Sequence, residues 1–300
     1  MKKLITLLLV LVSLNSYSQN DSVIAYYKEI TEDIWVTDKN TNEWVKDSTQ
    51  QWKWNEDVYI HVWGDKKDFI IKNGTIISMD PKIGVLYDAD VLVGDDTLVS
   101  VGPNLVAPPG AEEVDASNCI VMPGFIDTHR HIWQGAMRSV CADWSLMDYV
   151  RGIRMNAASA YTPDDMYAAQ YHGALEALDS GVTTVADYCH NINTPDHGHE
   201  AIRGLQDSNL RAVWSYGFNT PPLEDPAFKS RDDRVSFARD LAKQYFSDEL
   251  SLLTLGISPE EVFLWGEENQ NGIKQIELAN ELNSTFTTCD VLEENFSEKI

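Results

Sequence analysis

The second half of the chain alternates between short apolar runs and longer segments with helical spacing, which restricts the folds open to it. The apolar runs, each of strand length, are 125–129, 182–188, 211–216, 252–257 and 285–289. Helices are predicted between them, near 162–180, 199–207, 230–245 and 272–282. Strands separated by helices pair in parallel, because each helix returns the chain to the starting end of the sheet. We therefore predict an α/β fold with a parallel sheet or barrel over residues 119–300.

The helix predicted from Thr162 carries the clearest local signals. Thr162 is a suitable N-cap, Pro163 fits the first helical position, and Asp164 favours the positive end of the helix dipole. Gly181 can adopt the left-handed conformation that ends a helix. The sequence therefore places this helix between Thr162 and Gly181.

Residues 68–118 have the pattern of a small β domain. The segment 70–77 consists of two apolar half-strands around Asn73-Gly74, a dipeptide that favours tight hairpins. A second hairpin is predicted over residues 90–102. We expect these hairpins to form a small β-sandwich-like domain ahead of the barrel.

The first 18 residues have the pattern of a signal peptide. A basic start precedes an apolar run from Leu4 to Leu14, and small residues follow up to Ser18. The run is shorter than the roughly 20 residues that span a bilayer. We expect cleavage after Ser18, no membrane anchor after cleavage, and a periplasmic or secreted protein; an uncleaved anchor is the alternative.

Residues 19–67 form a separate, tryptophan-rich region. It contains Trp35, Trp44, Trp52, Trp54 and Trp63, and apolar residues alternate with polar ones along parts of it. Such alternation is typical of short strands with one buried face. We predict a β-rich appendage; a sugar-binding aromatic face is the alternative.

Charge and cysteine content narrow the classes of partner and site. Lys and Arg number 23 and Asp and Glu 47, so the formal net charge is -24. Nucleic acids and anionic membranes are negatively charged and attract basic surfaces, so we expect neither as a partner. The four cysteines form no CxxC pair, which argues against a thiol-redox motif or a cysteine-rich zinc site.

The sequence His129-Arg130-His131 lies where the first predicted barrel strand ends. Alternate side chains of a strand share a face, so both imidazoles can reach one metal ion at roughly 2.0–2.1 Å while Arg130 points away. Active sites of parallel barrels lie at the carboxyl ends of the strands. We predict that His129 and His131 are metal ligands; two partly exposed surface histidines are the alternative.

The run from Val121 to His131, VMPGFIDTHRH, resembles the PGxID-x-H-x-H signature of the amidohydrolase superfamily. The likeness continues through residues 174–185, a helix followed by a G-x-T-T strand, and the small β domain is also similar to one that these enzymes carry. The most similar branch contains cytosine deaminases, chlorohydrolases and S-adenosylhomocysteine deaminases. The resemblance implies a (β/α)8 TIM-type barrel, with about five of its eight β units present, behind a small N-terminal β domain.

In this superfamily a metal-bound water attacks the carbon of a C–N or C–halogen bond in a heterocycle or amide. The metal lowers the pKa of that water towards about 7. Members with two metals bridge them with a lysine on strand four, and residues 252–257 contain no lysine. The resemblance therefore implies hydrolytic deamination of a small-molecule substrate with one divalent metal, zinc or, as the alternative, iron.

The chain departs from the superfamily pattern in its last part. Where the superfamily has a histidine after strand five, this chain aligns Cys289, and Leu292 stands at the glutamate position. A thiolate can bind zinc, so Cys289 is a candidate third ligand; a buried thiol is the alternative. From Ile120 onward the chain is shorter than the roughly 250 residues of a complete barrel. We expect the N-terminal part of a larger enzyme and assign no catalytic acid or base.

Four further residues are candidates for the surroundings of the metal. Gln134 and Trp133 follow the paired histidines and His190 follows the second strand, so each is a candidate for substrate contact. Loop packing is the alternative for Trp133, and a solvated position is the alternative for His190. Asp127 shares a face with His129 and is expected to orient a metal ligand by hydrogen bonding.

A second function, from a different class, competes with the hydrolase hypothesis. The chain can be an inactive N-terminal fragment, or an exported binding protein, that keeps the fold without turnover. Metal content near one per chain without hydrolysis favours this alternative.

Overall fold

The computed structural model describes most of the chain after residue 67 and short segments before it. The described residues are 10–11, 21–25, 34–37, 44–47, 60–63, 68–94, 97–219, 221–247, 251–260 and 270–288. Cys289 and Leu292 lie outside them, as does most of the predicted signal peptide. The chain divides into two compact units, one formed by residues 1–125 and 181–183, the other by residues 126–180 and 184–300. The predicted start of the barrel, residue 119, therefore falls a few residues before the observed division.

The described segments before residue 64 are five short strands of the first unit. They are β1 (Val10–Leu11), β2 (Asp21–Ala25), β3 (Ile34–Thr37), β4 (Trp44–Asp47) and β5 (Ile60–Trp63). β1, β2 and β5 form one antiparallel sheet, and β3 pairs with β4. The described part of the region 19–67 is therefore β-structure, as the alternation of its residues predicts.

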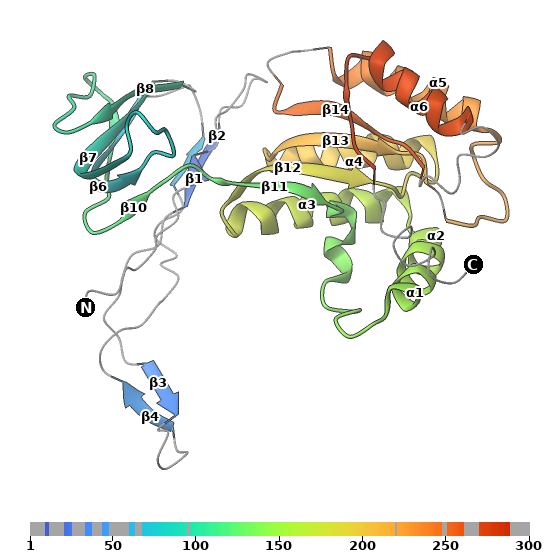
Figure 1. The fold of residues 1–300 in the computed structure, drawn as a ribbon, viewed down its shortest axis with the longest axis horizontal. Helices are drawn as coiled ribbons and strands as arrows, with labels where there is room; N and C mark the ends of the chain where they lie inside the picture. Colours follow the sequence, from blue (N-terminus) through green and yellow to red (C-terminus); the bar gives the residue numbers. More distant parts are fainter. Residues whose placement is uncertain are drawn as a thin grey trace. The chain divides into compact units, whose positions relative to one another are not determined.

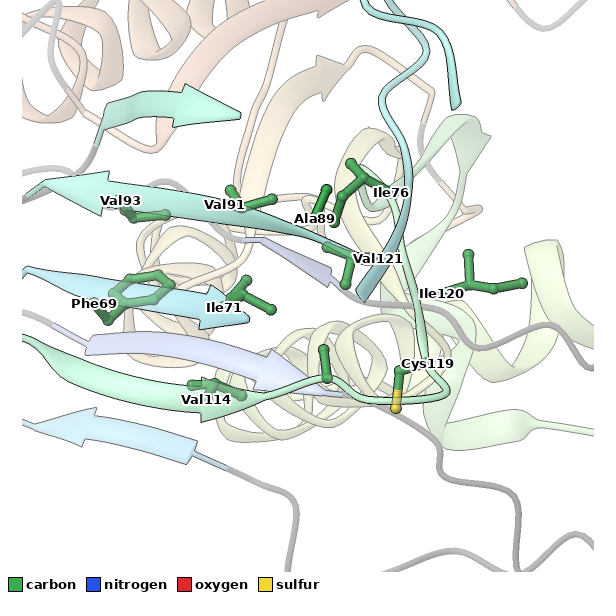
Figure 2. Close-up of a cluster of buried hydrophobic side chains, with 11 residues drawn as sticks. Phe69, Ile71, Ile76, Ala89, Val91, Val93, Val114, Cys119, Ile120 and Val121 are labelled. Atoms are coloured by element: carbon green, nitrogen blue, oxygen red, sulfur yellow. The ribbon is translucent and has the colours of Figure 1, made fainter. Parts of the chain in front are cut away.

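A five-stranded sheet follows in the first unit. Its strands are β6 (Phe69–Ile77), β7 (Val85–Gly94), β8 (Thr97–Gly102), β9 (Glu112–Asp115) and β10 (Ile120–Val121). The strand order is β10-β6-β7-β8, with β9 also paired to β6. Figure 2 shows its apolar core, in which Phe69, Ile71, Val91 and Val121 are buried. The segment at residues 120–121, which the sequence places at the entrance to the barrel, belongs to this sheet.

The hairpin predicted at Asn73-Gly74 is wrong, because β6 runs straight through these two residues. Asn73 has a φ of 64°, and the pairing of β6 with β7 shifts register between Ile71 and Gly74. The backbone N–H of Asn73 donates to Oδ1 of buried Asp90 at 3.0 Å. This bond replaces one that the interrupted β6–β7 ladder does not provide. The left-handed conformation that Asn-Gly favours is thus used for a β-bulge. The hairpin predicted over 90–102 is confirmed by the antiparallel pairing of β7 with β8.

The second unit contains the predicted parallel sheet. Its strands are β11 (Phe125–Arg130), β12 (Val182–Cys189), β13 (Arg211–Gly217), β14 (Leu253–Ser258) and β15 (Thr285–Phe286). They lie in the order β11-β12-β13-β14-β15, and the pairs from β12 to β15 are parallel. Helices connect these strands along the sheet (Figure 1). This arrangement confirms the α/β prediction.

The four predicted helices of this unit are present, and the helical segments between residues 132 and 160 were not predicted. The helices are α1 (Leu146–Tyr149), α2 (Ala158–Ala160), α3 (Pro163–Asp179), α4 (Pro195–Ser208), α5 (Arg231–Tyr245) and α6 (Gln270–Glu281), together with a 3-10 helix, η2 (Ile132–Met137), and a π-helix, η3 (Val150–Ala157). α3 begins with the predicted N-cap, Thr162, which forms a capping box with Asp165. Gly181 follows the helix with a φ of 80°. In the described part of the chain, no helix has both the length and the apolar character that a membrane span requires.

The two faces of the parallel sheet have different neighbours. On one face, Asp187 of β12 contacts Gln170 of α3, and Tyr216 of β13 packs against Phe237 of α5. Side chains alternate along a strand, so Tyr188 lies on the opposite face. Its ring lies against those of His129 and His131, so β11 directs its paired histidines to that face. We call this face, which carries His129, His131 and Tyr188, the inner face.

Candidate active site

The paired histidines lie together at the carboxyl end of β11. Their ring centroids are 5.1 Å apart, as the i, i+2 spacing predicts. The Nδ1 atom of His131 lies 2.8 Å from the backbone carbonyl of Tyr188. Because a carbonyl only accepts hydrogen bonds, Nδ1 carries the proton and Nε2 keeps its lone pair free. Burial lowers the pKa of His131 to about 4, so its imidazole is neutral at pH 7. Neutrality and a free Nε2 lone pair are what metal binding requires.

A third imidazole, His190, joins this pair from the end of β12. Its ring stacks on that of His131, with centroids 4.2 Å apart and planes 7° apart. The indole N–H of Trp133 donates to Nδ1 of His190 at 2.8 Å. Trp133 can only donate, so His190 is protonated on Nε2. Burial also lowers the pKa of His190 well below its usual value, which keeps the ring neutral. The structure thus brings together four residues that the sequence singles out: His129, His131, Trp133 and His190.

Trp133 and Gln134 differ in their access to a ligand. Trp133 is fully buried, and its only polar group is engaged by His190. Its indole N–H fixes the position of the His190 ring, and substrate contact by Trp133 stays a prediction. Gln134 is half-buried and donates to the hydroxyl of Tyr149 at 2.6 Å.

Asp127 acts on the backbone of the paired histidines. Its Oδ1 accepts from the backbone amide of His129 at 3.1 Å, and its Oδ2 lies 3.7 Å from the guanidinium of Arg130. Asp127 does form a hydrogen bond with His129, the predicted metal ligand, but the bond holds the main chain of His129 and not its imidazole.

Asp187 is a buried carboxylate that the sequence did not single out, and it holds the segment that follows His129 and His131. Its Oδ1 accepts from the backbone amide of Ile132 and its Oδ2 from Nε2 of Gln170, each at 2.9 Å. Burial raises the pKa of Asp187 from 3.8 to about 6, against these hydrogen bonds, which lower it. Asp187 joins β12 to the residue directly after His131, across 55 positions of sequence. A carboxylate near the end of an apolar strand was the only local signal of this role.

Two imidazole side chains on the inner face, those of His129 and His131, are suited to bind a metal ion. His129 and His131 offer imidazole nitrogens, which zinc and iron accept readily. Within the described ranges, no group of three or more His, Cys, Asp or Glu side chains is placed to hold a metal ion. The candidate third ligand, Cys289, lies outside those ranges. The described residues therefore bring together two candidate ligands, His129 and His131, with the tautomer of His131 already set.

Gly217 of β13 leaves room for the backbone beside His190. A Cβ atom there would lie 2.6 Å from the carbonyl oxygen of Cys189 and 2.6 Å from Cα of His190, closer than real contacts allow. We expect Gly217→Ala to lower the free energy of unfolding by about 1–3 kcal/mol, the usual cost of overpacking. Urea unfolding checks this, with Gly102→Ala as the control because a Cβ at Gly102 meets no atom within 4 Å. Equal stability of the two variants would contradict the prediction.

Comparison with known proteins gives a consistent set of relatives. Residues 120–256 match the model of the amidohydrolase family. The chain is 32% identical over 150 residues to a 5-methylthioadenosine/S-adenosylhomocysteine deaminase of Symbiobacterium thermophilum; the alignment covers 49% of this chain and 33% of that protein.

Two solved structures share the fold. A variant of atrazine chlorohydrolase from Arthrobacter aurescens TC1, complexed with zinc and atraton, superposes with a TM-score of 0.63 at 23% identity, over 77% of this chain and 55% of that one. An adenosine deaminase from Xanthomonas campestris with bound zinc superposes with a TM-score of 0.59 at 19% identity, over 74% of this chain and 49% of that one. The sheet β11–β15 with its helices is accordingly part of a TIM-type barrel. The chain spans about a third of its curated relative and about half of these neighbours.

Proposed function

We propose that this protein is a member of the amidohydrolase family, whose model matches residues 120–256, and that it is a metal-dependent hydrolase that deaminates a nitrogen heterocycle, cleaving a C–N bond other than a peptide bond. The observation that carries the proposal is the pair His129 and His131 on the inner face. Their rings lie together, and the carbonyl of Tyr188 leaves Nε2 of His131 free to bind a metal. The named activity of the deaminase relative supports the reaction class.

We propose one divalent metal, zinc in the first place and iron as the alternative, held by His129 and His131. Bound zinc supplies a Lewis acid and lowers the pKa of a water ligand towards about 7. The chain's own residues prepare the donors. Tyr188 sets the tautomer of His131, Asp187 anchors the segment that follows it, and burial keeps the imidazole of His131 uncharged.

The proposed substrate is a small, soluble heterocycle. The net charge of -24 disfavours nucleic-acid and membrane partners. The pattern of residues 1–18 supports export to the periplasm or the medium as the place of action.

Metal analysis combined with an ammonia assay tests the proposal. We expect the purified protein to contain about one zinc per chain and to release ammonia from a nucleoside such as 5-methylthioadenosine. A chelator should abolish the release, and added zinc should restore it, because the metal is needed to activate water. Protein that binds no metal under these conditions would exclude the proposed site.

A second candidate function is a binding protein or fragment without turnover. The observation that favours it is that the described residues bring together only two metal-binding histidines and no third ligand. It predicts metal near one per chain with no ammonia release from any nucleoside or triazine offered. The same two measurements therefore separate the two functions.

A further inference from the structure

The imidazole of His131 is held by one hydrogen bond and by contacts with neighbouring rings. Its Nδ1–H donates to the backbone carbonyl of Tyr188 at 2.8 Å. A single bond of this kind fixes the position of Nδ1 but lets the ring turn about the N–H···O direction, and the last side-chain torsion of histidine has broad minima. The direction in which Nε2 points therefore depends on the contacts that fix the plane of the ring.

His190 supplies the contact that fixes this plane. The rings of His131 and His190 stack with centroids 4.2 Å apart and planes 7° apart. The rings of His129 and Tyr188 instead meet His131 at 80° and 69°. If His131 turned about its hydrogen bond, one edge of its ring would press into His190 and the other would lift away. In a close-packed interior both movements are unfavourable, so the stacked ring defines the orientation of His131.

His190 is itself held firmly in place. The indole N–H of Trp133 donates to its Nδ1 at 2.8 Å, and the two residues are 0% and 2% exposed. A Cβ atom on Gly217 would lie 2.9 Å from Cβ of His190, so only the missing side chain at Gly217 lets β13 pack this closely. Side chains that are fixed by packing and by a hydrogen bond can position a neighbouring group accurately. His190 is therefore a fixed platform for the ring of His131.

The same contacts show that His190 does not bind a metal together with His131. Trp133 can only donate, so Nδ1 of His190 accepts and Nε2 carries the single ring proton. The lone pairs of an imidazole lie in the plane of its ring. Two stacked planes only 7° apart do not meet within the roughly 2.0–2.1 Å of a zinc–nitrogen bond. His190 thus contacts a predicted metal ligand without sharing its metal.

We infer that His190 is a positioning residue, whose ring stacks on His131 and holds Nε2 of His131 in the direction that metal binding needs. This inference rests on the proposed metal site and goes beyond it, because the sequence singles out His190 only as a candidate for substrate contact. The face of the ring carries the effect, so another flat ring should replace it. Loss of a residue that orients a metal ligand reduces metal affinity about 10- to 100-fold.

His190→Ala and His190→Phe together test the inference. Alanine removes the ring, so the dissociation constant for zinc, measured by competition with a chromophoric chelator, should rise about 10- to 100-fold. Phenylalanine restores a ring face, so the dissociation constant should return close to the wild-type value. This variant should nevertheless lose stability, because the buried N–H of Trp133 no longer has its acceptor. A merely structural role of His190 predicts lower melting temperatures for both variants and unchanged zinc affinity for both.

Cobalt(II) gives a second measurement that does not depend on the phenylalanine variant. It binds the same nitrogen ligands as zinc, and its visible absorption depends on the arrangement of those ligands. We expect the cobalt spectrum of His190→Ala to differ from that of wild type while circular dichroism shows a folded protein. An unchanged spectrum would contradict the inference even if His190→Phe fails to fold.

His199→Ala is the matched control. His199 is a half-buried histidine of α4 with contacts of the same kinds: its Nδ1 lies 2.9 Å from the hydroxyl of Tyr245, and its ring meets that of Phe237 edge-on. Its loss should lower the melting temperature and leave the zinc affinity and the cobalt spectrum unchanged.

The outcomes separate this inference from the proposed function. Wild type and His190→Ala that bind zinc equally tightly would overturn the inference and leave the proposed metal site intact. A folded His190→Phe protein that binds zinc as weakly as His190→Ala would also overturn it, because the nitrogen atoms would then carry the effect. Wild-type protein that binds no zinc would overturn both. Binding that alanine weakens and phenylalanine restores, without ammonia release from wild type, would support the inference and reject the proposed deamination.

Discussion

Replacing His131 with alanine is expected to abolish stoichiometric zinc binding and, with it, ammonia release. His131 is one of the two imidazoles proposed to bind the metal on the inner face, and its tautomer is already set for binding. Losing a residue that merely orients a metal ligand reduces affinity or activity about 10- to 100-fold. Loss of a ligand itself should exceed that range. Zinc content by elemental analysis after dialysis, together with kcat/KM for ammonia release, checks both effects.

His172→Ala provides the matched control for this experiment. His172 lies on α3 and is exposed to solvent, so its removal should change neither zinc content nor kcat/KM. Circular dichroism of both variants shows whether the fold is kept. If His131→Ala retains one zinc per chain, His131 is not a ligand and the proposed site is wrong.

The free energy of unfolding is expected to depend on pH through the buried carboxyl group of Asp187. In the folded protein its carboxyl group has a pKa of about 6, against 3.8 as the usual value. Between these values the unfolded chain binds fewer protons than the folded one, so the free energy of unfolding falls as pH rises from about 4 to about 6. The stabilising contribution is fully present below pH 4 and lost above pH 6. Its size, from 1.36 kcal/mol per pKa unit, is about 3 kcal/mol.

Asp187→Asn removes this component because an amide does not titrate. The new amide can accept from Ile132 through its oxygen, and its NH2 group can face the unpaired Oε1 of Gln170 once that side chain turns over. We expect the difference in unfolding free energy between wild type and variant to change by about 3 kcal/mol between pH 4 and pH 6. Urea titrations at several pH values measure it. Asp164→Asn, at an exposed position on α3, is the control; if both variants follow wild type in parallel, burial does not act on Asp187 as described.

Features encoded by nearby residues were predictable from the sequence. The capping box at Thr162 and the left-handed Gly181 lie within a few residues of the helix ends that they define, and both are confirmed. The shared face of His129 and His131 follows from strand geometry alone. From residue 162 onward the alternation of strands and helices was equally readable, because each run of the periodic pattern is local, whereas the short helical segments between residues 132 and 160 were not predicted.

Features that depend on distant residues were not predictable. Asn73-Gly74 favours a left-handed backbone, but whether that makes a hairpin or a bulge depends on Asp90, which lies on another strand. Likewise, Asp187 gains its role from the backbone amide of Ile132, and the indole N–H of buried Trp133 has its hydrogen-bond acceptor in His190. These contacts span 17 to 57 positions and leave no periodic signal in the chain.

The order of the parallel sheet bears on how the chain is assembled during synthesis. From β11 to β15, each strand lies beside the one that directly precedes it in the sequence. A ribosome delivers these strands in the same order, so each newly emerged strand finds its pairing edge already in place. Short separations between pairing partners also keep the entropy cost of loop closure low. This half of the molecule can therefore grow by successive addition at a single edge, one strand and helix at a time.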